Sequence, residues 1–252
     1  MPPKDKDDKP PPAMGPGSKI RALIDALKKH LIVTEDKKKR MLLIDFTAIG
    51  FKTLPIEICK NEEVCELAVK FLLPFNKLKK LPANIDALAN LRYVDMRANL
   101  MTGIPGTFFK IPNLEYVNCS GNSIKSIPGT IKNCQLLHTL DVHGNKLKAL
   151  PKTINKCAAL LTLNAQFNQV RKINKTLYEL GADVNLSNNK LTDLPSAKIK
   201  TPALRRLDVS WNQITVVPDN IDKVYTLVYL NLAHNELEHR QGVHPGLPDF
   251  AP

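Results

Sequence analysis

The sequence predicts an α/β solenoid, in which similar units stack side by side and a parallel β-sheet lines the concave face. The first observation is a recurring asparagine, with intervals of 23 residues except for one of 21: Asn76, Asn99, Asn122, Asn145, Asn168, Asn189, Asn212 and Asn235. The second observation is that each asparagine lies in the same frame of apolar residues. A fixed period of this length is typical of repeats that bury their apolar edges only by stacking on one another.

Each unit predicts a short strand, a turn and an arm that returns on the opposite side. Around Asn145 the frame reads LxxLxLxxNxLxxLPxxIxxL, and the alternation of Leu140 with Val142 indicates a strand with one buried face. The wider spacing after the asparagine suits a turn and a short helical or extended arm, opened by Pro151. The asparagine amide both donates and accepts, so we expect a continuous internal ladder that satisfies buried peptide groups.

The units at 41–58 and around Asn168 are irregular. The first has Ile49 in place of the asparagine, and the 27 residues to Asn76 predict an insertion that bulges out between Cys59 and Leu67. After Asn168, Asn174 replaces the proline and Gly181 takes a position that is otherwise aliphatic, which predicts a less well-packed arm.

Four segments are expected. Residues 1–17 are rich in proline, lysine and aspartate and are predicted to be disordered. Residues 18–40 are predicted to hold an amphipathic cap helix, from Ser18 to about Val33, and a basic linker. A lid over the first unit is favoured for this helix over a membrane-binding or partner-recruiting role. The repeats occupy 41–237, and 238–252 form an irregular tail.

The cysteines and the hydropathy pattern predict a cytoplasmic protein. No stretch has the apolar length of a membrane helix, and the N-terminus is charged rather than signal-like. The five cysteines are an odd number, and Cys119, Cys134 and Cys157 occupy apolar frame positions, which indicates buried thiols in a reducing compartment. Cytoskeletal, ciliary or nuclear association is compatible with this composition.

The frame resembles the leucine-rich repeat superfamily, and specifically its intracellular 23-residue class of Ras-suppressor-like and other Ras-group proteins. The residues that carry the resemblance are the LPxxIxxL elements, such as Leu81-Pro82 with Ile85 and Leu150-Pro151 with Ile154. The resemblance implies a curved horseshoe that holds another protein on its concave sheet, with a small GTPase or its effector as the suggested partner. It implies no catalysis and no cofactor.

Stacking turns each exposed position of the frame into a column, and three columns carry aromatic and cationic residues. These types anchor protein interfaces because they combine a large contact area with a polar group. The predicted partner-binding residues are Tyr93, Arg97, Tyr116, His143, Phe167, Arg206, Trp211 and Tyr229. We expect two clusters, the first of Tyr93, Arg97 and Tyr116 and the second of Arg206, Trp211 and Tyr229. For any single ring, shielding of neighbouring aliphatic residues is an equally good interpretation.

Part of the net charge of +12 is organised as a basic stripe three residues after the asparagine. The stripe comprises Lys79, Lys125, Lys148 and Arg171, with an interruption at Thr102. A solvated edge that confers solubility is the favoured interpretation, and an acidic partner surface is the alternative. Nucleic acid is disfavoured because the stripe lacks interleaved aromatic residues.

Catalytic and metal-binding interpretations find little support. Ser120, His143 and Asp141 share the exposed face and could form a Ser, His and acid group. However, no oxyanion hole is evident, and an open sheet does not exclude water. The histidines at 234, 239 and 244 match no common zinc spacing, so we expect no metal site. The sequence therefore predicts a non-enzymatic interaction module or adaptor in signalling or cytoskeletal scaffolding. The alternative is a structural subunit of a ciliary or ribonucleoprotein assembly, bound through the basic stripe.

Overall fold

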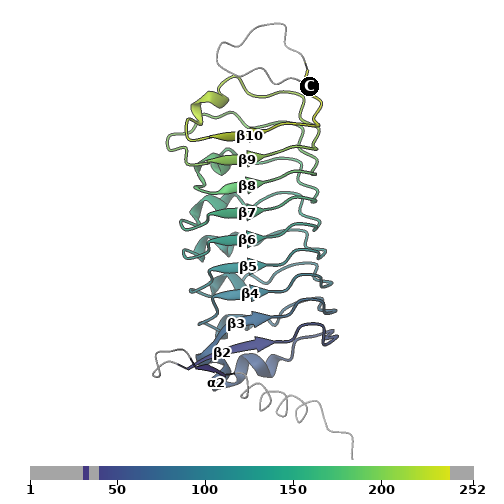
Figure 1. The fold of residues 1–252 in the computed structure, drawn as a ribbon, viewed down its shortest axis with the longest axis vertical. Coiled ribbons are helices and arrows are strands. Elements are labelled where there is room, and N and C mark those ends of the chain that lie inside the picture. The colour runs from purple at the N-terminus through teal and green to yellow at the C-terminus, as the bar shows by residue number, and fades with distance from the viewer. Residues whose placement is uncertain (1–30, 34–39, 239–252) are drawn as a thin grey trace, which may run out of the picture.

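The computed structural model describes residues 31–33 and 40–238. Within these residues, ten strands form a single sheet whose spatial order is the chain order (Figure 1). Strands β2 to β10 are parallel, whereas β1 pairs with β2 in the antiparallel direction. The strands are β1 (Leu31–Val33), β2 (Arg40–Asp45), β3 (Ala68–Leu72), β4 (Tyr93–Asp95), β5 (Tyr116–Asn118), β6 (Thr139–Asp141), β7 (Thr162–Asn164), β8 (Asp183–Asn185), β9 (Arg206–Asp208) and β10 (Tyr229–Asn231).

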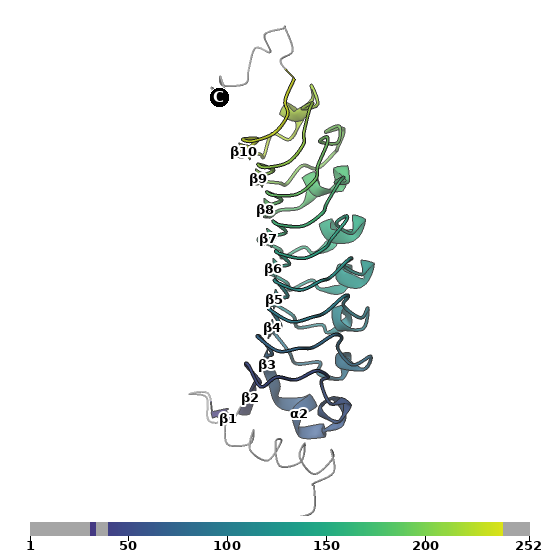
Figure 2. The same cartoon turned by 90° about the vertical axis from the view of Figure 1, so that its right-hand side faces the viewer.

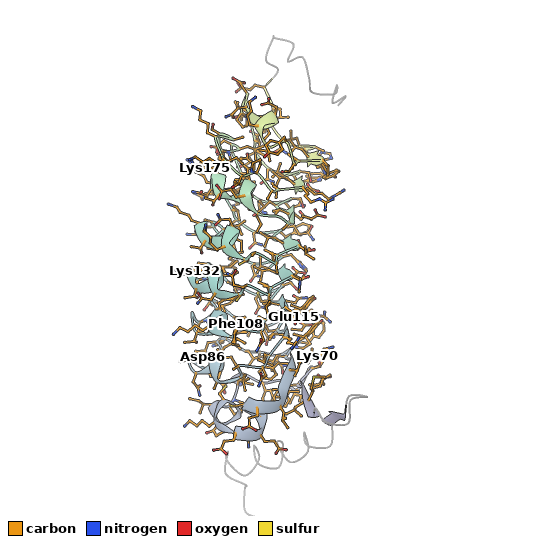
Figure 3. All side chains as sticks on the ribbon, turned by 90° about the vertical axis from the view of Figure 1, so that its left-hand side faces the viewer. Lys70, Asp86, Phe108, Glu115, Lys132 and Lys175 are labelled. Carbon is orange, nitrogen blue, oxygen red and sulfur yellow. The ribbon has the colours of Figure 1, made fainter. Side chains whose placement is uncertain are left out.

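The arms on the opposite side contain short helical segments (Figure 2). They are η2 (Ile56–Lys60), α2 (Glu62–Leu67), η3 (Ile85–Ala87), η4 (Phe108–Lys110), η5 (Gly129–Asn133), η6 (Lys152–Lys156), η7 (Lys175–Glu179) and η8 (Ile221–Lys223). Figure 3 shows Lys132 and Lys175 projecting on this side, away from Lys70 and Glu115 beside the strands. The predicted solenoid is confirmed, although the stack is elongated and bends only slightly, so that it is straighter than a horseshoe (Figure 2).

The core lies between the strands and the arms and contains the predicted apolar frame. In the coil of Asn145, Leu140, Val142, Leu147 and Ile154 are all buried. The same columns are buried in the neighbouring coils, so one continuous core runs through the stack. Each large aliphatic side chain that is fully removed from water contributes about 1.5–3 kcal/mol, which explains how such short strands are stable together.

The asparagine ladder is also confirmed, and each amide joins two coils. Asn145 donates through Nδ2 to the carbonyls of Val142 and Cys119, each at 3.0 Å, and of His143 at 3.2 Å. Its Oδ1 accepts from the backbone N–H of Ile124, in the preceding coil, at 2.9 Å. The corresponding bonds recur from Asn76 to Asn235. The amide therefore supplies the hydrogen bonds that the bend after each strand leaves open.

The insertion between Cys59 and Leu67 is a helix rather than a bulging loop. Asn61 caps α2, since its side chain accepts from the backbone N–H of Val64 at 2.9 Å. Val64 is buried against the first coils. The extra residues therefore extend the core at this end of the stack.

Two further sequence-based expectations need correction. The cap helix was expected to reach about Val33, but Leu31–Val33 form β1, whose backbone pairs with Met41 and its neighbours. The preceding part of that helix, like most of the 238–252 tail, lies outside the described residues. The arm after Asn168 is not poorly packed, because Tyr178 is fully buried and its hydroxyl donates to the Pro195 carbonyl at 3.0 Å. Gly181 is exposed, and Leu180 and Ala182 occupy the core beside it.

Candidate functional site

The residue immediately before each asparagine has a left-handed backbone conformation. The φ angles at this position lie between 53° and 62° in nine successive coils. Eight of these residues precede the asparagines, namely Phe75, Ala98, Gly121, Gly144, Phe167, Asn188, Trp211 and His234, and the ninth is Ala48, which precedes Ile49 in the first coil. This conformation turns the chain so that the next side chain, the asparagine, points into the core. Glycine adopts it without strain, whereas a bulky side chain in it is unusual.

Large aromatic side chains nevertheless occupy this column, and they are exposed. Trp211 and Phe167 are 56% and 55% exposed. Trp211 stacks on His234 of the next coil, with ring centroids 3.9 Å apart and an interplanar angle of 19°. These rings therefore form an aromatic rim at the carboxyl ends of the last strands, and they do not fill the core. Their strain is the kind of local cost that clusters at functional sites.

The strand face, defined here as the exposed side of β2 to β10, carries a second group of rings in its N-terminal half. Tyr93 and Tyr116 are register partners on β4 and β5, and their rings stack at 4.2 Å with an interplanar angle of 2°. Lys70 of β3 places its Nζ 4.4 Å from the centroid of the Tyr93 ring. Burial, followed by the influence of the neighbouring Tyr116 hydroxyl, raises the pKa of Tyr93 to about 12. The stack is therefore a neutral aromatic shelf with a cation at one end.

Arg97 and His143 are held in place by aspartates on the same face. Arg97 pairs with the buried Asp95 at 3.1 Å, and its guanidinium lies 5.5 Å from the Phe75 ring centroid. His143 contacts Asp141 through Nδ1 at 2.8 Å. Because aspartate fixes both side chains, a partner would meet them already oriented.

The grouping of Ser120 with His143 and Asp141 lacks the bond that catalysis would require. The Ser120 hydroxyl is buried and donates to Asn118 Oδ1 at 2.7 Å. Its proton is therefore directed away from His143, and the hydroxyl is not presented as a nucleophile.

The second predicted cluster forms two separate pairs. The Arg206 guanidinium lies 4.3 Å from the centroid of the Tyr229 ring, and its Nε is 3.9 Å from Asp183 Oδ2. This pair lines a shallow depression of about 340 Å³ on β7 to β10, together with Asp208 and neighbouring polar residues. Trp211 instead stacks on His234 at the rim.

Lys70 and His234 are not among the eight predicted partner-binding residues. Lys70 lies six positions before Asn76, in the column of Tyr93 and Tyr116, and His234 lies in the column of Trp211. The positions of these residues in the repeat columns could therefore have identified both as candidate binding residues.

The basic stripe lies along a different surface, the loop edge, which comprises the exposed positions one to four after each asparagine. Lys79, Lys125, Lys148 and Arg171 are exposed there, and Lys52 occupies the same offset in the first coil. A bridge between Ala149 and Lys172 shows that successive coils lie side by side along this edge. Within residues 40–238, no ion pair neutralises these five cations.

Two family models match parts of the chain. One, described as "Leucine Rich repeats (2 copies)", matches residues 112–152, and the other, described as "Leucine rich repeat", matches residues 182–238. The coils within residues 112–152 and 182–238 therefore match leucine-rich repeats. Such repeats generally serve as protein-interaction modules, because stacking creates an extended binding surface. Among curated protein sequences, none matches the chain.

Solved structures share the fold. The plant peptide hormone receptor RGFR1 in complex with RGF2 aligns with a TM-score of 0.60 and 24% identity over 73% of this chain and 30% of the receptor chain. A plant ice-binding protein gives 0.61 and 22% over 82% of this chain and 68% of its own. YopM from Yersinia enterocolitica WA-314 gives 0.59 and 22% over 90% and 44%. The chain thus spans less than a third of the receptor, and likenesses at this identity establish the fold alone.

In the part of the chain that the structure describes, no group of three or more histidine, cysteine, aspartate or glutamate side chains is placed to hold a metal ion. Of the helices within 31–33 and 40–238, none combines the length and the apolar character that crossing a bilayer requires.

Proposed function

We propose that this chain is a non-enzymatic adaptor that binds a folded protein on its strand face. The observation that carries the proposal is the aromatic rim: Phe167 and Trp211 are exposed although their backbone is strained. A left-handed residue other than glycine costs about 1–2 kcal/mol. Neither ring offsets this cost by packing in the core, which favours a role in recognition.

The strand face supplies the other elements of a binding surface. Tyrosine, tryptophan and arginine are the residues that most often dominate binding energy. Here Tyr93 and Tyr116 are already stacked, and Arg97 is already paired. A surface with fixed side chains loses less conformational entropy on binding than a flexible one. His143, Arg206 and Tyr229 extend this surface along the stack.

The resemblance and the thiols support an intracellular setting for the proposed function. The LPxxIxxL frame is similar to that of the intracellular Ras-group class, which suggests a role in signalling or cytoskeletal scaffolding and a small GTPase or its effector as partner. The five free cysteines, four of them buried, suit the reducing cytoplasm. The receptor RGFR1, solved in complex with RGF2, is a precedent for ligand binding by this fold.

Paired variants test the proposal. Proximity labelling in the native cell identifies the neighbours of the wild-type chain, and the labelling is repeated with Tyr116→Ala/Trp211→Ala. We expect the principal protein neighbour to be lost, whereas Tyr225→Ala, which removes an exposed ring outside the strands, should retain it. Retention of every neighbour by the double variant would show that the strand face is not the binding surface.

The exposed cations on the loop edge favour a second candidate function, that of a structural subunit in a ciliary or ribonucleoprotein assembly. In this case the reversal of Lys79, Lys125, Lys148 and Arg171 to glutamate should abolish assembly, and the aromatic double variant should not. Equal loss from both sets would defeat the assignment of one function to each surface.

A further inference from the structure

A groove of about 550 Å³ opens on the loop edge near the N-terminal end of the stack. It spans three coils, from Thr53 through Lys79 to Gly103. This position lies beyond the turn that follows each strand, so the groove is separate from the strand face and from its aromatic rim. Its volume is within the range of pockets that bind ligands, roughly 300–1,000 Å³.

The floor of the groove is apolar. Leu54, Leu81 and Ile104 form it, and each is a frame residue from a successive coil. Ile56 stands at one side and is 44% exposed. Pro82 also lines the groove, and it has no N–H to offer a ligand. An occupant would therefore gain affinity on the floor by burying aliphatic surface.

The rim of the groove is cationic. Lys79 and Lys80 line it, and Lys52 precedes Lys79 in the same column. All three are exposed, and no carboxylate in residues 40–238 forms an ion pair with them. Neighbouring like charges repel one another, so an anionic group at the rim would be attracted to all three.

The groove exists because small residues interrupt the stripe. Thr102 and Gly103 occupy the positions that Lys79 and Lys80 hold one coil earlier. A Cβ added at Gly103 would meet nothing within 4 Å, and its backbone is not left-handed. In later coils, β-bridges join residues at the offset that Gly103 has in its own coil: Ala149 with Lys172, and Asp193 with Val216. Within residues 40–238, no such bridge joins Lys80 to Gly103.

We propose that this groove binds a short extended segment of a partner protein that combines aliphatic side chains with adjacent aspartate or glutamate residues. The aliphatic side chains would cover Leu54, Leu81 and Ile104, and the carboxylates would face Lys79 and Lys80. A nucleic acid could use the lysines, but none of the twelve lining residues is aromatic, so no platform for base stacking is present. The segment therefore complements the groove in both charge and polarity.

Gly103→Trp provides a direct test, because it adds a bulky side chain at a lining residue of the groove without straining the backbone. A phage-displayed library of random peptides is selected on the wild-type chain and counter-selected on Gly103→Trp. We expect the selected peptides to place aspartate or glutamate beside leucine, isoleucine or valine. If no peptides sensitive to Gly103→Trp are obtained, or if those obtained lack either feature, the proposal is wrong.

A selected peptide, synthesised with a fluorophore, then gives affinities by fluorescence anisotropy. Gly103→Trp should weaken binding at least about ten-fold, and Lys79→Glu should do the same. Lys148→Glu is the matched control, since it makes the same charge change at the same offset outside the groove, and it should change the affinity less than about two-fold. If Lys148→Glu weakens binding equally, the peptide is attracted by the basic stripe as a whole and not by the groove.

Further measurements test whether a nucleic acid or a lipid surface occupies the groove instead of a peptide, and whether the groove acts independently of the strand face. Single-stranded oligo-uridine and anionic phosphatidylserine vesicles should bind the wild type and Gly103→Trp alike. If either of these probes binds Gly103→Trp more weakly than the wild type, while the peptide binds both equally, the proposal is wrong. Tyr116→Ala/Trp211→Ala should leave peptide affinity unchanged, so that failure of the groove and failure of the strand face give different results.

Discussion

The asparagine ladder leads to a quantitative prediction for Asn145→Ala. The substitution removes Oδ1, the acceptor for the buried N–H of Ile124 at 2.9 Å. An unpaired buried donor costs about 1–3 kcal/mol. The carbonyls are less affected, because each keeps a second donor: Cys119 O still accepts from Asn122, and Val142 O from Asn168. Adding a modest loss for these shared bonds gives a destabilisation of about 2–4 kcal/mol.

Asn235→Ala provides the internal control because Asn235 makes the same bonds at the end of the ladder. It accepts from Ile214 N at 3.0 Å, and it is only partly buried. Water can replace its amide there, so we expect a loss of about 1 kcal/mol or less. Urea unfolding, followed by far-UV circular dichroism and by the fluorescence of Trp211, measures both losses, and coincidence of the two signals checks the two-state assumption. A cost for Asn145→Ala below about 1 kcal/mol, or one equal to that of Asn235→Ala, would refute this accounting of shared bonds.

Three further predictions concern strain, packing and the thiols. The left-handed column predicts opposite effects for Ala98→Gly and Gly144→Ala, a gain and a loss of about 1 kcal/mol each in the free energy of unfolding; effects of the same sign would contradict the strain argument. Tyr178→Phe removes the hydrogen bond to the partly buried Pro195 carbonyl and should cost about 0.5–1.5 kcal/mol, and an unchanged melting temperature would contradict this. Burial raises the pKa of Cys134 from 9.0 to about 12, so the stability gained from its neutral thiol is complete below pH 9.0 and is lost as the pH rises toward 12. At about pH 8, a disulfide reagent should therefore modify the partly exposed Cys65 first, and mass spectrometry that found Cys134 modified in the folded chain would contradict this.

The repeat frame was readable from the sequence because it depends on position alone. The asparagines and the aliphatic residues around Leu140 and Val142 recur at fixed intervals, and stacking by translation brings equivalent residues together. The columns that contain Tyr93 and Trp211 were predictable for the same reason. The sequence also revealed where the period fails, at the insertion after Cys59 and in the short unit after Asn168.

The outcome at these irregular points was not readable from the period. Whether the insertion bulges or folds depends on whether Val64 finds a buried site, and this is decided by the packing of the first coils. The arm after Asn168 is well packed because Tyr178 fills the space, an adjustment of side-chain volume that spacing does not encode. In both places, contacts between coils override the local pattern.

The sequence by itself determined the solenoid, its internal amide ladder and the columns of residues that share a face, because translation carries a linear period directly into space. The tertiary structure decided which neighbours in those columns touch: Trp211 stacks on His234 rather than joining Arg206 and Tyr229, and Arg97 is held by Asp95. It also revealed that the interruption at Thr102 and Gly103 is an open groove. Side-chain rotamers and the space between coils depend on distances of a few ångströms across different repeats, and a repeat period contains no such distances.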